Sequence, residues 1–108
     1  MIRVVFYNNS DKNICGFSVE GHAGYAKYGK DIVCAGVSAL TINTINSIEA
    51  LTDNSVEYIM EDSGLIKFKF KTQPDEMGLL LINSYMLGIK NLNEEYGNKY
   101  LQLYFKEV

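Results

Sequence analysis

The chain has 108 residues and a mass of 12.2 kDa, with 47% hydrophobic and 21% charged residues. This length predicts a single domain over residues 1–108, and a content of one Pro and nine Gly excludes collagen-like and disordered chains. Ten Lys and Arg against thirteen Asp and Glu give a net charge of −3, so the basic excess of general nucleic-acid binders is missing. We therefore expect no direct nucleic-acid partner.

The cysteine and histidine content excludes two further classes. Two cysteines cannot build the disulfide framework of a small secreted domain. One His and two Cys are too few for a structural zinc site, so we expect no metal and no other cofactor. The N-terminus has no signal-peptide pattern, and no stretch has the roughly 18 apolar residues of a membrane span. We expect a cytoplasmic protein without a membrane partner.

The N-terminal third predicts a hairpin followed by a loop. Residues 2–7 and 14–20 are rich in β-branched and aromatic residues, as strands are, and residues 8–13 between them have the composition of a turn. Periodicity then stops at residues 21–31, where glycines recur, so we expect a flexible loop.

A long helix is predicted after this loop. Asp31 is a good N-cap, and small or apolar residues then recur at helical spacing up to about residue 51. The expected inner face consists of Val33, Val37, Leu40, Thr44, Ile48 and Leu51.

The C-terminal half predicts a second hairpin, a second helix and a last strand. Residues 56–60 and 65–70 are the expected strands, the latter with alternating apolar and Lys residues. Pro74 suits a first helical position, and Gly97 a helix stop. Residues 100–105 form the last expected strand. The inner face of the second helix is expected to hold Met77, Leu81, Tyr85, Ile89, Leu92 and Tyr96.

This element order defines the expected fold class. The order ββαββαβ, with a hairpin on either side of the first helix, predicts an α+β two-layer sandwich. We expect a mainly antiparallel sheet with both helices on one face.

Cys34 is the first candidate catalytic residue. If Asp31 caps the helix, Cys34 lies in its first turn, where free N–H groups and the helix dipole favour a thiolate. The amides near Cys34 and Ala35 would stabilise an oxyanion formed by attack of that thiolate on a carbonyl. The alternative is a small buried apolar residue, the commoner fate of a free cysteine.

Three other residues are candidates for roles beside Cys34. His22, the one histidine, would be its general base, or else a surface residue at a strand end. Asp31 is a helix cap, a third catalytic residue, or both. Ser38 shares a helical face with Asp31 and Cys34 by its spacing, and it either lines the site or eases helix packing. Cys15 is expected to fill the core beside Phe17 and Val19.

The motif Gly21-His22-Ala23, Gly29, Asp31-Ile32-Val33-Cys34-Ala35 and Val37-Ser38-Ala39-Leu40 resembles that of the ribosomal-processing cysteine protease (Prp) family of small bacterial proteins. The spacing between His22 and Cys34, the length and the element order fit along essentially the whole chain.

The resemblance implies an activity and a set of roles. Members of the family remove a short N-terminal extension from a large-subunit ribosomal protein, cutting after a phenylalanine-containing hydrophobic segment. Cys34 corresponds to the nucleophile and His22 to the general base, while Asp31 and Ser38 match further motif positions. Members are homodimers, and the loop between His22 and Cys34 is mobile and gates the site; here it carries Gly21, Ala23, Gly24 and Gly29.

Two other interpretations stay open at this point. The chain would be a non-enzymatic homodimeric binding module on the ribosome, with structural Cys34 and His22. Or it would be a cysteine hydrolase with a substrate other than a ribosomal protein.

Overall fold

The computed structural model describes residues 1–27 and 30–108. These residues form five strands and two helices in the order ββαββαβ, which confirms the expected α+β fold. The elements are β1 (Ile2–Asn8), β2 (Ile14–Gly21), α1 (Ile32–Leu51), β3 (Val56–Met60), β4 (Ile66–Phe70), α2 (Glu76–Tyr96) and β5 (Leu101–Glu107).

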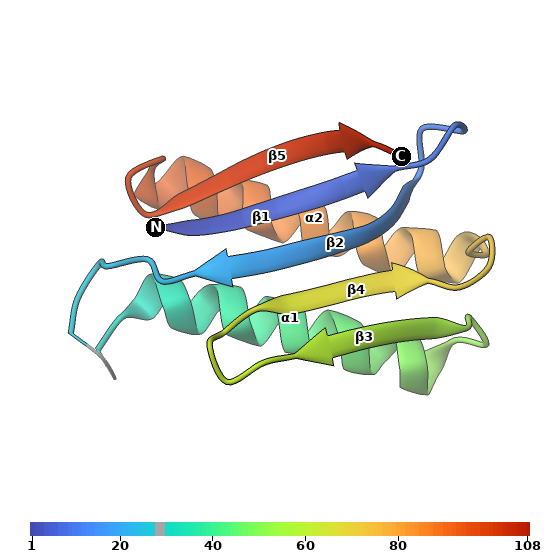
Figure 1. The fold of residues 1–108 in the computed structure, drawn as a ribbon, viewed down its shortest axis with the longest axis horizontal. Coiled ribbons are helices and arrows are strands. Elements are labelled where there is room, and N and C mark those ends of the chain that lie inside the picture. The colour runs from blue at the N-terminus through green and yellow to red at the C-terminus, as the bar shows by residue number, and fades with distance from the viewer. Residues whose placement is uncertain (28–29) are drawn as a thin grey trace.

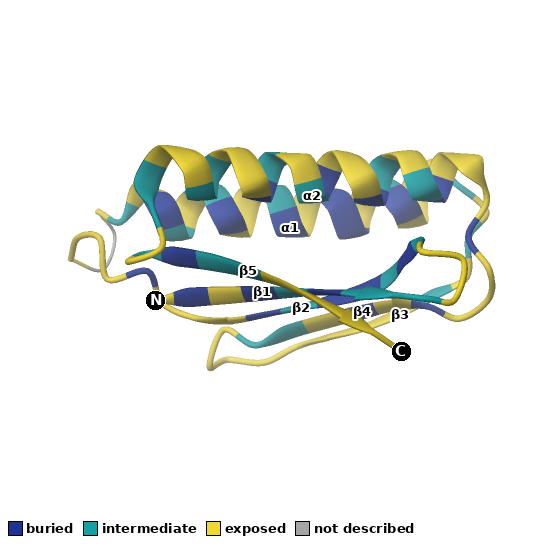
Figure 2. Ribbon diagram, turned by 90° about the horizontal axis from the view of Figure 1, so that it is seen from above, coloured by how far each residue is buried: buried dark blue, intermediate teal, exposed yellow. Residues whose placement is uncertain are grey.

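The strands form one mixed sheet in the order β3-β4-β2-β1-β5 (Figure 1). β1 pairs with β5 in parallel, while the β1–β2, β2–β4 and β3–β4 pairs are antiparallel. Both helices cover one face of this sheet, as expected (Figure 2). The end of β2 and the start of α1 lie at the same end of the molecule as the start of β1, so the loop between them crosses that end (Figure 1).

The second helix begins later than its sequence predicts. Asp75 is the N-cap, because its carboxylate accepts the Gly78 amide at 2.9 Å, so Pro74 precedes the helix instead of opening it. The side chain of Asn54 fixes this cap by donating to the Asp75 carboxylate at 2.8 Å and accepting the Asp75 amide at 3.0 Å. Gly97 ends the helix as expected.

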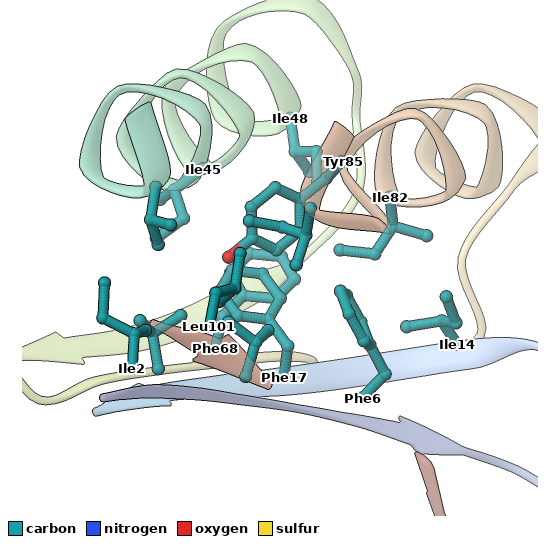
Figure 3. Packing of buried hydrophobic residues seen from close by; sticks show 14 of the residues in the cluster. Ile2, Phe6, Ile14, Phe17, Ile45, Ile48, Phe68, Ile82, Tyr85 and Leu101 are labelled. Atoms are coloured by element: carbon teal, nitrogen blue, oxygen red, sulfur yellow. The ribbon is translucent and has the colours of Figure 1, made fainter. Parts of the chain in front are cut away.

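The core lies between the sheet and the two helices (Figure 3). Tyr85 of α2 packs on Phe6 and Phe17, with ring centroids 5.6 and 4.6 Å away. Its buried hydroxyl lies 2.7 Å from the hydroxyl of Thr41 on α1, so the one polar atom of this large side chain has a partner inside the core.

The predicted inner faces are wrong at two helix positions. Leu51, the last residue of α1, is 66% exposed, and the buried row uses Thr41 and Ile45 instead. Met77 is 55% exposed, while its neighbour Gly78 is buried. A Cβ on Gly78 would lie 2.7 Å from the Asn54 side chain, so the first turn of α2 presses this glycine, and not Met77, against the rest of the fold.

α1 differs from expectation in its overall hydrophobicity. Among the described residues, α1 is a helix that is long enough and apolar enough to cross a membrane, with a mean hydropathy of 1.2. The sequence predicted no such stretch. Its buried side chains, including Val33, Val37 and Ile48, belong to the core cluster that packs on the sheet. This packing accounts for the buried row of α1 only, because 33% of the stretch is buried and apolar residues such as Ile32 and Ile42 are exposed.

Candidate active site

The junction between the loop and α1 is organised by the carboxylate of Asp31. One oxygen accepts the amides of Val33 and Cys34, each at 3.0 Å, which makes Asp31 the N-cap that the sequence predicts. The other oxygen accepts the amide of Tyr25 at 3.0 Å. The carboxylate therefore joins the loop to the first turn of the helix.

Cys34 lies in this first turn and is half-buried. Its sulfur accepts a hydrogen bond from the amide of Ala23 at 3.2 Å. Ala23 is 3% exposed and belongs to the core cluster, so this donor comes from a buried residue. His22 and Cys34 are twelve positions apart in the sequence. The contact brings the segment that carries His22 against the start of α1.

The thiol of Cys34 is the favoured form in this arrangement. Burial raises its pKa above the ordinary value of 9.0, and the neighbouring Asp31 carboxylate raises it further. The amide of Ala23 acts in the opposite direction and does not outweigh them. The thiolate-favouring effect expected of the helix start thus does not prevail, because burial and the neighbouring Asp31 carboxylate both raise the pKa of Cys34.

The pKa of Asp31 is shifted the other way. Burial alone would raise it, but the amide hydrogen bonds from Cys34 and Tyr25 lower it below the ordinary value of 3.8. Asp31 is therefore a carboxylate at neutral pH and keeps its full capacity to accept these amides.

His22 has an exposed side chain directly after β2. Its imidazole lies beside the turn between β3 and β4, since a Cβ on Gly64 would be 3.9 Å from the ring carbon Cε1. In the part of the chain that the structure describes, no hydrogen bond joins His22 to Cys34. The structure thus brings the residue after His22 to the Cys34 sulfur through the Ala23 amide.

The amides expected to stabilise an oxyanion are both engaged. The Cys34 amide donates to the side chain of Asp31, and the Ala35 amide donates to its carbonyl oxygen at 3.1 Å. The amide that donates to the sulfur is instead that of Ala23, a residue for which the sequence predicted only a place in the gating loop. Nothing local in the sequence identifies it, because the contact joins residues eleven positions apart.

The remaining motif residues differ in how close they lie to this centre. Ser38 and Ala35 are exposed on α1. Gly21 ends β2 with a φ of 91°, and Gly24 follows Ala23 with a φ of 69°. Gly29 lies outside the described residues.

Tyr25 is a loop residue near this centre, and the sequence left open whether it contacts substrate or is solvated. Its ring meets those of Tyr96 and Tyr100 edge-on, with centroids 5.5 and 5.0 Å away. These two tyrosines come from the end of α2 and the residue before β5, so the contact depends on the fold and on no local pattern.

The expected place of Cys15 is wrong. A bulge pairs Tyr7 with Gly16 and Asn8 with Ile14, which leaves Cys15 without a partner in β1. Ile14 therefore fills the core, and Cys15 lines a groove of about 680 Å³ on the sheet face away from the helices, together with Tyr7, Lys67 and other residues. Cys15 and Cys34 are both free thiols.

Metal binding has no candidate in the described part of the chain. No three His, Cys, Asp or Glu side chains gather there closely enough to hold an ion.

Known proteins with a similar sequence share one description. The family model described as "Cysteine protease Prp" matches residues 1–101. The ribosomal processing cysteine protease Prp of Bacillus subtilis is 31% identical, over 89% of this chain and 90% of its own. The Prp of Staphylococcus aureus strain Mu50 is 32% identical, over 98% of this chain and 100% of its own.

Solved structures agree with these sequence matches. An essential ribosomal processing protease Prp from Staphylococcus aureus, in complex with a covalently linked product peptide, superposes with a TM-score of 0.93. It is 28% identical and covers 98% of this chain and 100% of its own. A protein from Streptococcus mutans has a TM-score of 0.86 and 33% identity, over 100% of this chain and 96% of its own.

Proposed function

The chain belongs to the cysteine protease Prp family, and from this premise we propose that it removes the N-terminal extension of a bacterial large-subunit ribosomal protein, with Cys34 as nucleophile. It is a cysteine protease, a hydrolase of peptide bonds. The observation that carries the proposal for Cys34 is its position: a half-buried thiol in the first turn of α1 with the Ala23 amide directed at its sulfur.

His22 is the general base and acid of the proposed reaction. It is the one histidine of the chain, and it immediately precedes the residue whose amide meets the sulfur. Catalytic hydrogen bonds are often long in a free enzyme and shorten when substrate binds. The proposal therefore requires the imidazole to turn from the Gly64 side toward Cys34.

The proposed chemistry proceeds through a thioester. His22 takes the thiol proton, and the thiolate attacks the scissile carbonyl carbon to form a tetrahedral oxyanion. The peptide C–N bond breaks, and the leaving amine takes the proton from His22. Water then attacks the thioester and gives one proton to His22, which returns it to the Cys34 sulfur as the C–S bond breaks. The carboxylic acid product leaves and loses its remaining proton to solvent. The covalently linked product peptide of the Staphylococcus aureus relative supports such covalent catalysis.

The raised pKa of Cys34 fits a nucleophile that is activated only during the reaction. A thiol that stays protonated in the free enzyme is protected from oxidation and other side reactions. The amide of Ala23 already lies at the sulfur, so it is the proposed donor that stabilises negative charge there as the proton moves to His22.

The proposed working form is a homodimer in the cytoplasm that binds the extended ribosomal protein, as the family resemblance implies. The substrate peptide bound to the Staphylococcus aureus Prp supports a peptide substrate. The non-enzymatic binding module is not favoured, because the relatives are named proteases.

The test incubates the extended ribosomal protein with four forms of this chain: native, Cys34→Ala, His22→Ala and Cys15→Ala. Mass spectrometry identifies any cut. We expect one defined N-terminal cut by the native chain, none by Cys34→Ala, and a loss of about 10²-fold or more in His22→Ala. Cys15→Ala is the matched control and should cut normally, since Cys15 lies on the far face of the sheet. A cut by Cys34→Ala would overturn the proposal.

A further inference from the structure

The short segment from Ala23 to Tyr25 is held at both of its ends. At one end the Ala23 side chain is buried in the core and its amide meets the Cys34 sulfur. At the other end the Tyr25 amide meets the Asp31 carboxylate, and the Tyr25 ring packs on Tyr96 and Tyr100. Among the described residues, no atom lies within 4 Å of the position that a Cβ on Gly24 would take. The position of the segment therefore comes from its two ends.

The aromatic contacts form the second part of the outer end, beside the hydrogen bond from the Tyr25 amide to Asp31. Tyr96 and Tyr100 are half-buried and pack against the core, and the Tyr100 carbonyl accepts the Ile2 amide at 2.9 Å. They give the Tyr25 ring a packing surface whose position is fixed by α2 and the sheet. The ring itself is 42% exposed, and its hydroxyl makes no hydrogen bond to the described residues. Its contribution must therefore come from the edge-on ring contacts.

We propose that Tyr25 is a positioning residue of the active site: its ring, held by Tyr96 and Tyr100, fixes the loop so that the Ala23 amide donates to the Cys34 sulfur. This inference rests on the proposed role of Cys34 as nucleophile. In this proposal Tyr25 acts on the sulfur through Ala23. Without the ring, the loop would leave the sulfur without its donor for part of the time, and the thiolate would be harder to form.

The test uses Tyr25→Ala and Tyr25→Phe, with Tyr104→Ala as the matched control. Tyr104 is likewise 42% exposed, but it lies on β5 and outside the loop. All variants carry Cys15→Ser, so that iodoacetamide reports on Cys34 alone. The readouts are the alkylation rate against pH, kcat and KM on the extended ribosomal protein, and the thermal melt.

We expect Tyr25→Ala to lower the alkylation rate at pH 8 by about tenfold, the order of effect on an equilibrium constant of losing its edge-on contacts with Tyr96 and Tyr100. Its pH dependence should shift upward, kcat should fall, and the melting temperature should stay near the native value. Tyr25→Phe should restore both rates, and Tyr104→Ala should change neither.

Two outcomes overturn the proposal. Unchanged alkylation in Tyr25→Ala means that the ring does not position the donor, and faster alkylation means that the loop shields the thiol. Failure of the proposed function has a different signature: the native chain cuts no substrate, or Cys34→Ala still cuts. If alkylation nevertheless depends on Tyr25, the positioning role stands and only the substrate assignment fails.

Discussion

The carboxylate of Asp31 accepts the amide of Cys34 at 3.0 Å and lies beside the thiol of the same residue. The first contact stabilises the start of α1, and the second opposes ionisation of the nucleophile. The same carboxylate also accepts the amide of Tyr25. One side chain thus couples helix capping, loop position and thiol chemistry, and each of these consequences can be measured separately.

Asp31→Ala should destabilise the fold by about 1 kcal/mol at pH 7, the typical effect of losing an N-cap, and should impair cleavage. Because the pKa of Asp31 is lowered by folding, its contribution is present above the unfolded-state value and is lost as pH falls through the folded-state value. The difference in unfolding free energy between native and variant should therefore shrink in acid below about pH 3.8. Urea unfolding at several pH values measures it.

Asp75→Ala is the control for this prediction. Asp75 caps α2 through the Gly78 amide and is tied to Asn54, with no contact to the loop. It should lose similar stability and keep its cleavage rate. Equal losses of activity in the two variants would show that capping alone, and not the loop contact, accounts for the effect of Asp31.

Alkylation of Cys34 in the free protein should be slow at pH 7. Burial and the Asp31 carboxylate raise its pKa above 9.0, so thiol predominates and each pH unit should increase the rate by about tenfold up to that pKa. The measurement is iodoacetamide labelling of Cys15→Ser between pH 6 and about pH 10, followed by mass spectrometry. A rate that has already reached its plateau at pH 7 would contradict the raised pKa and indicate a resident thiolate.

Local patterns in the sequence predicted the fold and the helix start well. Alternating strands, the Asp31 cap and Cys34 in the first helical turn are all set by residues a few positions apart, where sequence periodicity and capping preferences act directly. The prediction failed where a distant partner intervenes. α2 starts after Pro74, at the Asp75 cap, and the side chain of the distant Asn54 is hydrogen-bonded to that cap.

The same contrast between local sequence patterns and distant contacts holds for the site. The motif and its family resemblance predicted a site at Cys34, His22 and Asp31, and in the structure the Ala23 amide meets the Cys34 sulfur while the Cys34 amide meets Asp31. The Ala23 donor and the packing of Tyr25 on Tyr96 depend on three-dimensional contacts that no local pattern contains. The bulge that turns Cys15 out of the core is likewise a matter of strand register.

The buried hydroxyl pair between the helices predicts an asymmetric pair of mutants. Thr41 donates to the Val37 carbonyl at 2.7 Å, so the Tyr85 hydroxyl donates to Thr41. Tyr85→Phe removes a donor and should cost about 1 kcal/mol. Thr41→Val leaves the Tyr85 hydroxyl buried without a partner and should cost about 1–3 kcal/mol.

The double variant Tyr85→Phe with Thr41→Val tests the coupling. Once the tyrosine hydroxyl is gone, the valine leaves no buried donor unpaired, so the double variant should lose less than the sum of the two single losses. Unfolding free energies from urea titration of all four forms give the cycle. Additive losses would mean that the two hydroxyls do not depend on each other.

Gly21 and Gly24 should respond differently to alanine, although both have a φ in the left-handed region. Gly24→Ala adds a Cβ that meets no atom of the described residues within 4 Å, so we expect only the backbone cost of about 1 kcal/mol. Gly21→Ala adds a Cβ that would lie 2.3 Å from the Met1 carbonyl oxygen, and β1 or β2 must shift to admit it. We expect a clearly larger loss of unfolding free energy in urea titration. Since Gly21 precedes His22, cleavage by Gly21→Ala should fall as well, even at temperatures where the variant stays folded. Equal stability losses in the two variants would show that the end of β2 shifts at little cost. Unchanged cleavage would show that Gly21 does not fix the position of His22.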